Sequence, residues 1–157
     1  MLIEAKTQDF AALLRGEAPN PYSLCDSPLA PPEVLAMLGE LAERIGQTFH
    51  PSAWMIVEDG EIVGLISLTG PLDPYDRSLQ LGYGVAQTRW GRGAATRAVA
   101  DLAAWARGDE HVLALTAETS VENPASQTVL ARNGFTVVGG REDSEDGSLI
   151  CWRLETI

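Results

Sequence analysis

A glycine-rich segment is the part of the sequence whose residue types and spacing most directly suggest chemistry. Residues 89–96 read RWGRGAAT and lie between a strand-like segment and a segment with helical periodicity. Glycines let a backbone approach a ligand closely, and the first N–H groups of a helix have no partner within that helix. These donors and the positive end of the helix dipole favour pyrophosphate, to which Arg92 can add charge-assisted hydrogen bonds. A turn that serves only packing fits the same residues.

Other phosphate-binding loops and metal sites are excluded by their own spacing rules. A P-loop requires GxxxxGK[ST], and no lysine follows the glycines here. A dinucleotide-binding fold requires GxGxxG, but Thr96 occupies the place of the third glycine. His50 and His111 stand alone, so the sequence predicts no metal site.

The elements that must position the glycine-rich turn follow from hydrophobic periodicity and turn residues. Strands are predicted at 2–6, 53–58, 61–68, 78–86, 111–118, 135–140 and 147–155. Helices are predicted at 8–15, from Pro32 to Gly46, from the glycine-rich turn to Gly108, and from Asn123-Pro124 to Asn133-Gly134. Asp59-Gly60 favours a type I′ hairpin turn, and the Pro-rich residues 19–32 predict a loop.

The order of these elements predicts an α/β fold, with a mixed sheet and helices on both faces. The step from strand through glycine-rich turn and helix to strand predicts a crossover between nearly adjacent parallel strands. No repeat, low-complexity tract or domain boundary is evident in the 157 residues, so we expect one domain over 1–157.

Two separated motifs resemble the GNAT superfamily of N-acetyltransferases. They are the runs GYGVAQTRWGRGAATRAV and ENPASQTVLARNGF, and within the superfamily they are most similar to the ribosomal-protein N-acetyltransferase (RimJ/RimL-like) branch. The signature Q/R-x-x-G-x-G/A falls on residues 90–95, with Trp90 in place of Gln or Arg. The signature N-x-x-S followed by K/R-x-G-F falls on Asn123, Ser126, Arg132, Gly134 and Phe135. The resemblance covers about residues 53–140.

The resemblance implies a fold and an activity. The fold is a central, largely antiparallel sheet with a splayed pair of parallel strands and helices on both faces. The activity is transfer of an acetyl group from acetyl-CoA to a primary amine by direct attack on the thioester. The acceptor would be a protein N-terminal α-amine or a small-molecule amine, and the residues leave its identity open.

The resemblance also implies which residues hold CoA. The N–H groups of residues 91–96 would bind the pyrophosphate, and the Val85 N–H would hold the thioester oxygen. Asn123 is a helix cap on sequence grounds, and the family implies a further bond to the pantetheine arm. The full predicted set is Tyr83, Gly84, Val85, Trp90, Gly91, Arg92, Gly93, Ala94, Ala95, Thr96, Asn123 and Ser126.

Proton transfer is assigned to two catalytic candidates, Ser126 and Glu118. Many GNAT enzymes protonate the departing thiolate with a tyrosine, but that position holds Leu130 here, so Ser126 is the candidate acid. Relatives often carry a glutamate base where this chain has Gln80, which cannot accept a proton. Glu118, at the end of the next predicted strand, is the nearest alternative base. The alternative interpretation of Ser126 is a hydroxyl that only bonds the local backbone, and that of Glu118 is a solvated carboxylate without a catalytic role.

Composition sets the remaining expectations. A net charge of −11 argues against binding to nucleic acid or to anionic membrane. Cys25 and Cys151 are too few for a disulfide scaffold, and the N-terminus lacks a signal-peptide pattern, so we expect a cytoplasmic monomer or homodimer. The Pro-rich segment lies where relatives shape the acceptor pocket. The acidic residues 142–146 fit either the mouth of that pocket or a solvated hairpin tip.

Two alternatives stay open at this level. A CoA-binding sensor or interaction module without catalysis fits the missing tyrosine and glutamate. A longer acyl-CoA in place of acetyl-CoA fits the same CoA motifs.

Overall fold

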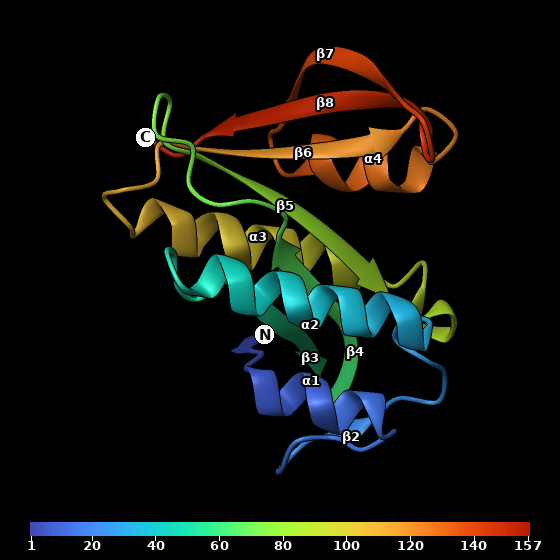
Figure 1. The fold of residues 1–157 in the computed structure, drawn as a ribbon. Coiled ribbons are helices and arrows are strands. Elements are labelled where there is room, and N and C mark those ends of the chain that lie inside the picture. Colours follow the sequence, from blue (N-terminus) through green and yellow to red (C-terminus); the bar gives the residue numbers. More distant parts are fainter.

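The computed structural model describes residues 1–157 and contains one mixed sheet with four α-helices (Figure 1). The strands are β1 (Leu2–Glu4), β2 (Ser23–Leu24), β3 (Ala53–Glu58), β4 (Glu61–Leu68), β5 (Ser78–Val85), β6 (Ala114–Ser120), β7 (Thr136–Asp143) and β8 (Gly147–Glu155). The helices are α1 (Thr7–Leu14), α2 (Pro32–Gly46), α3 (Ala94–Arg107) and α4 (Pro124–Arg132), with a 3₁₀ turn, η1 (Gln87–Arg89). The order of strands in the sheet is β1-β3-β4-β5-β6-β8-β7, and β2 pairs with β4.

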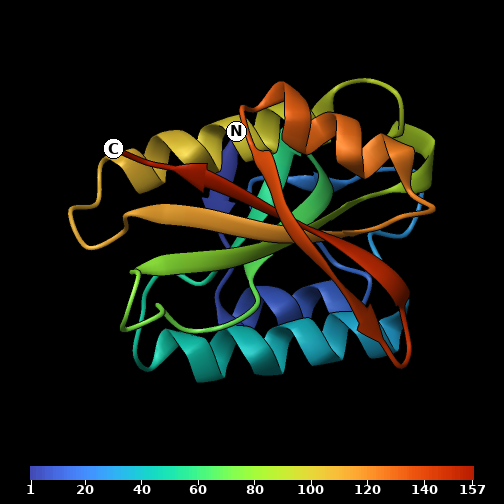
Figure 2. The ribbon, with the colours of Figure 1, turned by 90° about the horizontal axis from the view of Figure 1, so that it is seen from above.

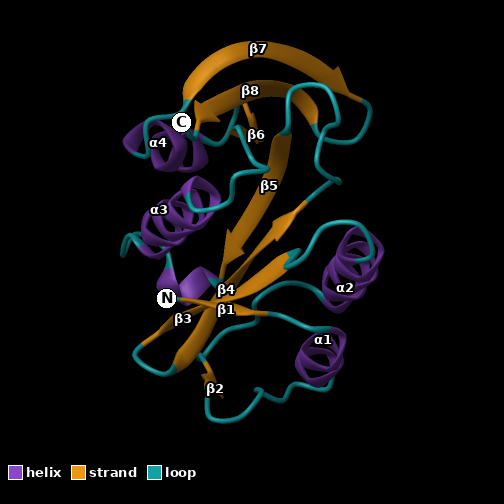
Figure 3. Cartoon of the chain, turned by 90° about the vertical axis from the view of Figure 1, so that its left-hand side faces the viewer, coloured by secondary structure: helices purple, strands orange, loops and turns teal.

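The helices cover the two faces of the sheet, as the sequence predicts. Figures 2 and 3 show α1 and α2 on one side and α3 and α4 on the other. The larger apolar cluster lies under α3 and includes Val99, Leu102 and Leu115, whereas a smaller cluster under α1 and α2 includes Phe10 and Met55. Burial of these apolar side chains fixes the register of each strand, because a shift by one residue would turn them to the opposite face. No helix is long and apolar enough to cross a membrane.

The parallel strands β5 and β6 separate along their length. They pair from Ser78↔Ala114 to Leu81↔Ala117, but β5 continues beside β4 as far as Val85↔Gly64. In Figure 1 the two arrows start together and their heads lie apart. The splayed pair implied by the family resemblance is therefore present.

Backbone groups of β5 face the gap that this separation opens. The Ala86 N–H donates to the Val63 carbonyl and the Thr69 N–H to the Gln80 carbonyl, so the even-numbered residues of β5 bond toward β4. Alternation along a strand then directs the N–H and C=O groups of Tyr83 and Val85 toward the gap. The fold thus supplies free backbone donors at the place where β6 leaves β5.

Several elements differ from the sequence prediction in their bounds, and one short strand was not predicted. The strand predicted from residue 111 begins at Ala114. His111 instead lies in a turn, where its N–H donates to the Asp109 carboxylate at 2.8 Å. It ends at Ser120, so the expectation that Glu118 ends its strand is wrong. The Pro-rich segment contains the two-residue strand β2, and β7 extends through the acidic stretch to Asp143.

The turn predictions are confirmed. Asp59 and Gly60 both have positive φ, at 50° and 79°, as a type I′ hairpin requires. Asn123 caps α4 with Pro124 in its first turn, and Gly108 follows the last residue of α3.

Candidate active site

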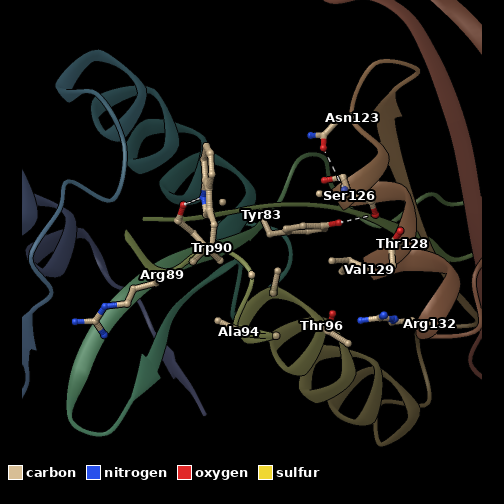
Figure 4. Close-up of a pocket in the computed structure, with 16 residues that line it drawn as sticks. Tyr83, Arg89, Trp90, Ala94, Thr96, Asn123, Ser126, Thr128, Val129 and Arg132 are labelled. Atoms are coloured by element: carbon tan, nitrogen blue, oxygen red, sulfur yellow. Dashed lines mark hydrogen bonds between the residues drawn. The ribbon is translucent and has the colours of Figure 1, made fainter. Parts of the chain in front are cut away.

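A cavity of about 550 Å³ lies between the end of β5, the glycine-rich turn with the start of α3, and one face of α4 (Figure 4). It is lined by Tyr83, Gly84, Val85, Arg89, Trp90, Gly91, Gly93, Ala94, Ala95, Thr96, Asn123, Ala125, Ser126, Thr128, Val129 and Arg132. Residues from three separate parts of the chain therefore meet at one hollow.

The first wall is the glycine-rich turn and the first turn of α3. Gly91 and Gly93 have φ of 75° and 80°, a backbone region that side chains other than glycine strain to adopt. Gly93 is the N-cap of α3, and the first helical bond runs from the Arg97 N–H to the Gly93 carbonyl at 3.0 Å. The N–H groups of residues 94–96 precede that bond and have no partner within the helix. They form a site for an anion at the positive end of a 14-residue helix.

The second wall is the N-cap and one face of α4, which contribute side chains. The Asn123 Oδ1 accepts the Ser126 N–H at 3.2 Å and caps the helix. The amide nitrogen of Asn123 is a separate donor that the cap does not use. The Tyr83 hydroxyl donates to the Ser126 carbonyl at 3.3 Å and joins β5 to α4 across the cavity (Figure 4). Burial raises the pKa of the Tyr83 phenol, so the side chain is neutral near pH 7.

Trp90 determines which backbone group of Val85 remains free. Its indole nitrogen donates to the Val85 carbonyl at 2.7 Å, although 65% of the residue is exposed. Because Trp90 occupies the carbonyl of Val85, the N–H of the same residue is the group that remains free toward the gap. A donor in this place suits an oxygen that gains negative charge during a reaction.

Glu118 lies outside the cavity lining, in an ion pair with Arg141. The Arg141 Nη2 is 2.9 Å from the Glu118 Oε1, and the Arg141 Nε also donates to the carboxylate. The bond from Arg141 holds the pKa of the Glu118 carboxyl below its usual value. A carboxylate stabilised in its charged form is a weaker proton acceptor, and the assignment of Glu118 as general base stays a prediction.

The predicted CoA-binding residues come together with one exception. All of them line the cavity except Arg92, which is exposed and outside the lining. The lining also contains Arg89 and four residues of α4 outside the predicted CoA-binding set, namely Ala125, Thr128, Val129 and Arg132, of which Arg132 was identified only as a motif position. The α4 residues recur at the spacing of one helix face, so the predicted helix together with Ser126 contained the signal for them.

Comparison with known proteins gives a consistent assignment. The model of the acetyltransferase (GNAT) domain family matches residues 2–136. The ribosomal-protein-serine acetyltransferase of Escherichia coli (strain K12) is 25% identical over 99 residues, which are 63% of this chain and 55% of that protein. The chain thus spans little more than half the length of this relative.

Solved structures share the fold. A RimL ribosomal L7/L12 alpha-N-protein acetyltransferase in complex with coenzyme A superposes with a TM-score of 0.72 and 19% identity, over 98% of this chain and 92% of that one. The microcin C7 self-immunity acetyltransferase MccE in complex with acetyl-CoA and AMP superposes with a TM-score of 0.71 and 16% identity, over 98% and 91%. The splayed strands, the glycine-rich turn and the family match agree, and the chain belongs to the GNAT acetyltransferase domain family.

Proposed function

We propose that the protein transfers an acetyl group from acetyl-CoA to a primary amine, either the N-terminal α-amine of a protein or the amine of a small molecule. One observation carries the proposal: unpaired backbone donors at the splay and at the start of α3 converge on the same cavity. Family membership supports it, as do structural neighbours that hold acetyl-CoA or CoA. The acidic chain with two free cysteines fits a reducing cytoplasm.

The cavity suggests how the donor substrate would lie. The pyrophosphate of acetyl-CoA would accept hydrogen bonds from the N–H groups of residues 94–96. Arg132 would add positive charge there, since its guanidinium points toward Thr96 in Figure 4. The pantetheine arm would run between β5 and α4 and accept a bond from the Asn123 amide. This places the thioester beside Val85.

The reaction then needs few protein groups. The amine nitrogen attacks the thioester carbon, and the Val85 N–H stabilises the charge that develops on the oxygen. A C–N bond forms as the C–S bond breaks, and the departing thiolate takes a proton from the Ser126 hydroxyl. The amine loses one proton to solvent or to a base, and Ser126 regains one from solvent, so the reaction consumes no net proton.

The weakness of the available base favours an acceptor that is partly neutral on its own. A lysine amine of pKa about 10.4 is neutral in roughly 1 of 2,500 molecules at pH 7, whereas an α-amine of pKa about 7.7–8.0 is neutral in about 10–15%. Since Gln80 cannot take a proton and Arg141 holds Glu118, we propose an α-amine or a small amine of modest pKa as acceptor.

Release of free thiol from acetyl-CoA tests the activity. A panel of peptides with free N-termini, lysine derivatives and polyamines serves as acceptors, with longer acyl-CoA donors in parallel. We expect turnover with α-amines, at a rate that rises with pH in step with the pKa of the acceptor. The Glu118→Gln variant should follow the same pH profile, and an enzyme pKa that disappears in this variant would identify Glu118 as the base instead.

A CoA-binding module without catalysis is the second candidate. The observation that favours it is the lack of the usual proton-transfer groups. The position of the usual tyrosine acid holds Leu130, which is fully buried, and Arg141 holds Glu118 in an ion pair. Tight CoA binding with no thiol release on any acceptor would establish this candidate over the first.

A further inference from the structure

The glycine-rich turn has no apolar anchor of its own. Ala86 and Ala94 are buried, but no residue between them is. Within this stretch the backbone bonds are local, from the Arg89 N–H to the Ala86 carbonyl and from the Trp90 N–H to the Gln87 carbonyl. The position of the turn relative to the sheet must therefore come from polar contacts with other segments.

The edge of β4 brings one such segment alongside. The Val63 carbonyl accepts the Ala86 N–H at 2.8 Å, and the adjacent Ile62 carbonyl accepts the Cys25 N–H at 3.4 Å. Two consecutive carbonyls of β4 thus hold the end of β5 and the chain that leaves β2. Residues 25–27 lie beside residues 86–89 for this reason, although about 60 positions separate them in the sequence.

Five polar residues, which we call the clasp, join these segments: Asp26, Ser27, Glu61, Thr88 and Arg89. The Thr88 hydroxyl donates to the Asp26 carboxylate at 2.6 Å and is 3.0 Å from the Ser27 hydroxyl, which also accepts the Thr88 N–H at 3.3 Å. Arg89 pairs with Glu61 at 2.9 Å and with Asp26 at 3.5 Å. The bond from Thr88 lowers the pKa of the Asp26 carboxyl, which keeps it ionised and able to accept.

We propose that the clasp positions the glycine-rich turn for the CoA pyrophosphate and couples this turn to the Pro-rich segment. Asp26, Ser27 and Thr88 are positioning residues, because none of them lines the cavity. The inference rests on the proposed function, since it takes the anion at the turn to be that of CoA. It adds that a segment outside the cavity contributes to donor affinity.

The coupling reaches further along the Pro-rich segment. Leu29 and Ala30, a few residues after the clasp, pack against the apolar cluster under α1 and α2. Tyr22 and Leu24, before the clasp, pack against the same cluster, so the core holds the segment on both sides of the clasp and the turn contacts it between them. When CoA occupies the glycine-rich turn, the clasp should therefore restrict the motion of the Pro-rich segment next to it, at residues 25–29.

Thr88→Val is the central test, because it removes a hydroxyl and keeps the size and the branched shape of the side chain. Thr88→Ser, which restores the hydroxyl, and Thr136→Val, which changes an exposed threonine of β7 away from the cavity, are the matched variants. CoA affinity is measured by calorimetry, KM and kcat by thiol release, and amide exchange by mass spectrometry with and without CoA.

We expect Thr88→Val to raise the Kd for CoA and the KM for acetyl-CoA about three- to tenfold, with kcat changed less than about twofold. Thr88→Ser and Thr136→Val should match the parent protein. CoA should slow amide exchange in residues 25–29 of the parent protein but not in Thr88→Val, and a purely structural role would not produce this difference.

The outcomes separate the two proposals. If the parent protein binds CoA and Thr88→Val binds it equally well with the same exchange pattern, the clasp inference is overturned and the proposed function stands. If the parent protein binds no CoA, the proposed function fails, and the positioning role that depends on it fails too.

Discussion

The two walls of the cavity supply different kinds of groups. The wall of the glycine-rich turn and α3 offers backbone N–H donors. Gly91 and Gly93 contribute to it by having no side chain, which lets the backbone adopt positive φ beside the cavity. The α4 wall offers side chains, above all Asn123 and Ser126. Backbone N–H groups stabilise negative charge but do not act as general acids near neutral pH, whereas a side-chain hydroxyl can donate a proton during the reaction. We therefore propose donor binding for the first wall and proton transfer for the second.

Ser126→Ala gives the largest expected effect and tests the role of the α4 wall. General-acid catalysis contributes about 10²–10⁴-fold to a rate, so we expect kcat to fall about 100-fold while the Kd for CoA stays near that of the parent protein. An acyl donor whose leaving thiol is more acidic should reduce the deficit, because that thiolate leaves without help. An unchanged kcat would mean that the α4 wall only binds.

Gly93→Val tests the backbone wall. The φ of 80° is strained for a β-branched residue, and an added Cβ would lie 2.8 Å from the Arg97 Nη1. Strain of about 1–3 kcal/mol at the turn should raise the KM for acetyl-CoA about fivefold or more, with a smaller effect on kcat. Gly16→Val places the same side chain at a φ of 75° with open space around it, far from the cavity. This control should lose stability without a change in KM, and an equal rise in KM would argue against a specific role for the turn.

Asn123 has the smallest expected effect and separates two roles within the α4 wall. Loss of the N-cap in Asn123→Ala should lower the free energy of unfolding by about 1 kcal/mol and raise the KM for acetyl-CoA. Asn123→Asp keeps an acceptor for the Ser126 N–H but has no amide donor. It should therefore restore the free energy of unfolding of the parent protein, while the KM for acetyl-CoA stays as high as in Asn123→Ala. Recovery of both by aspartate would show that Asn123 acts only as a cap. Chemical denaturation and thiol-release kinetics measure the two quantities.

The difference between the walls also explains what could be predicted from the sequence. A backbone site leaves a clear local pattern, because glycines at fixed spacing and a following helix are sufficient to form it. The wall of the glycine-rich turn and α3 was accordingly predicted almost completely, except that Arg92 does not line the cavity and Arg89, which does, was not predicted. On α4, Asn123 and Ser126 were predicted as CoA-binding residues, and Arg132 only as a motif position. Ala125, Thr128 and Val129 were not predicted, since their place in the cavity depends on which face of the helix meets β5.

Contacts between distant segments explain most of the rest. The strand β2 has two residues, which pair with Glu61 and Ile62 of β4. This part of the β4 edge is open because pairing with the end of β5 stops at the bond from Ala86 to Val63, and no local sequence pattern shows that. The pairing of Glu118 with Arg141 depends on the register of β6, β8 and β7, which is set by packing across the whole sheet. The local sequence therefore identifies Glu118 as a candidate base but not Arg141 as its partner.

The exposed indole at the rim of the cavity has a practical consequence for measurement. Of the four tryptophans, Trp54 and Trp152 are buried and Trp105 stacks edge-on against Trp54, whereas Trp90 is 65% exposed. Indole emission depends on solvent contact, so a ligand that enters beside Trp90 changes the signal of one fluorophore while the other three act as a constant background. The protein carries its own optical reporter of occupancy, and titrations can follow it without a label.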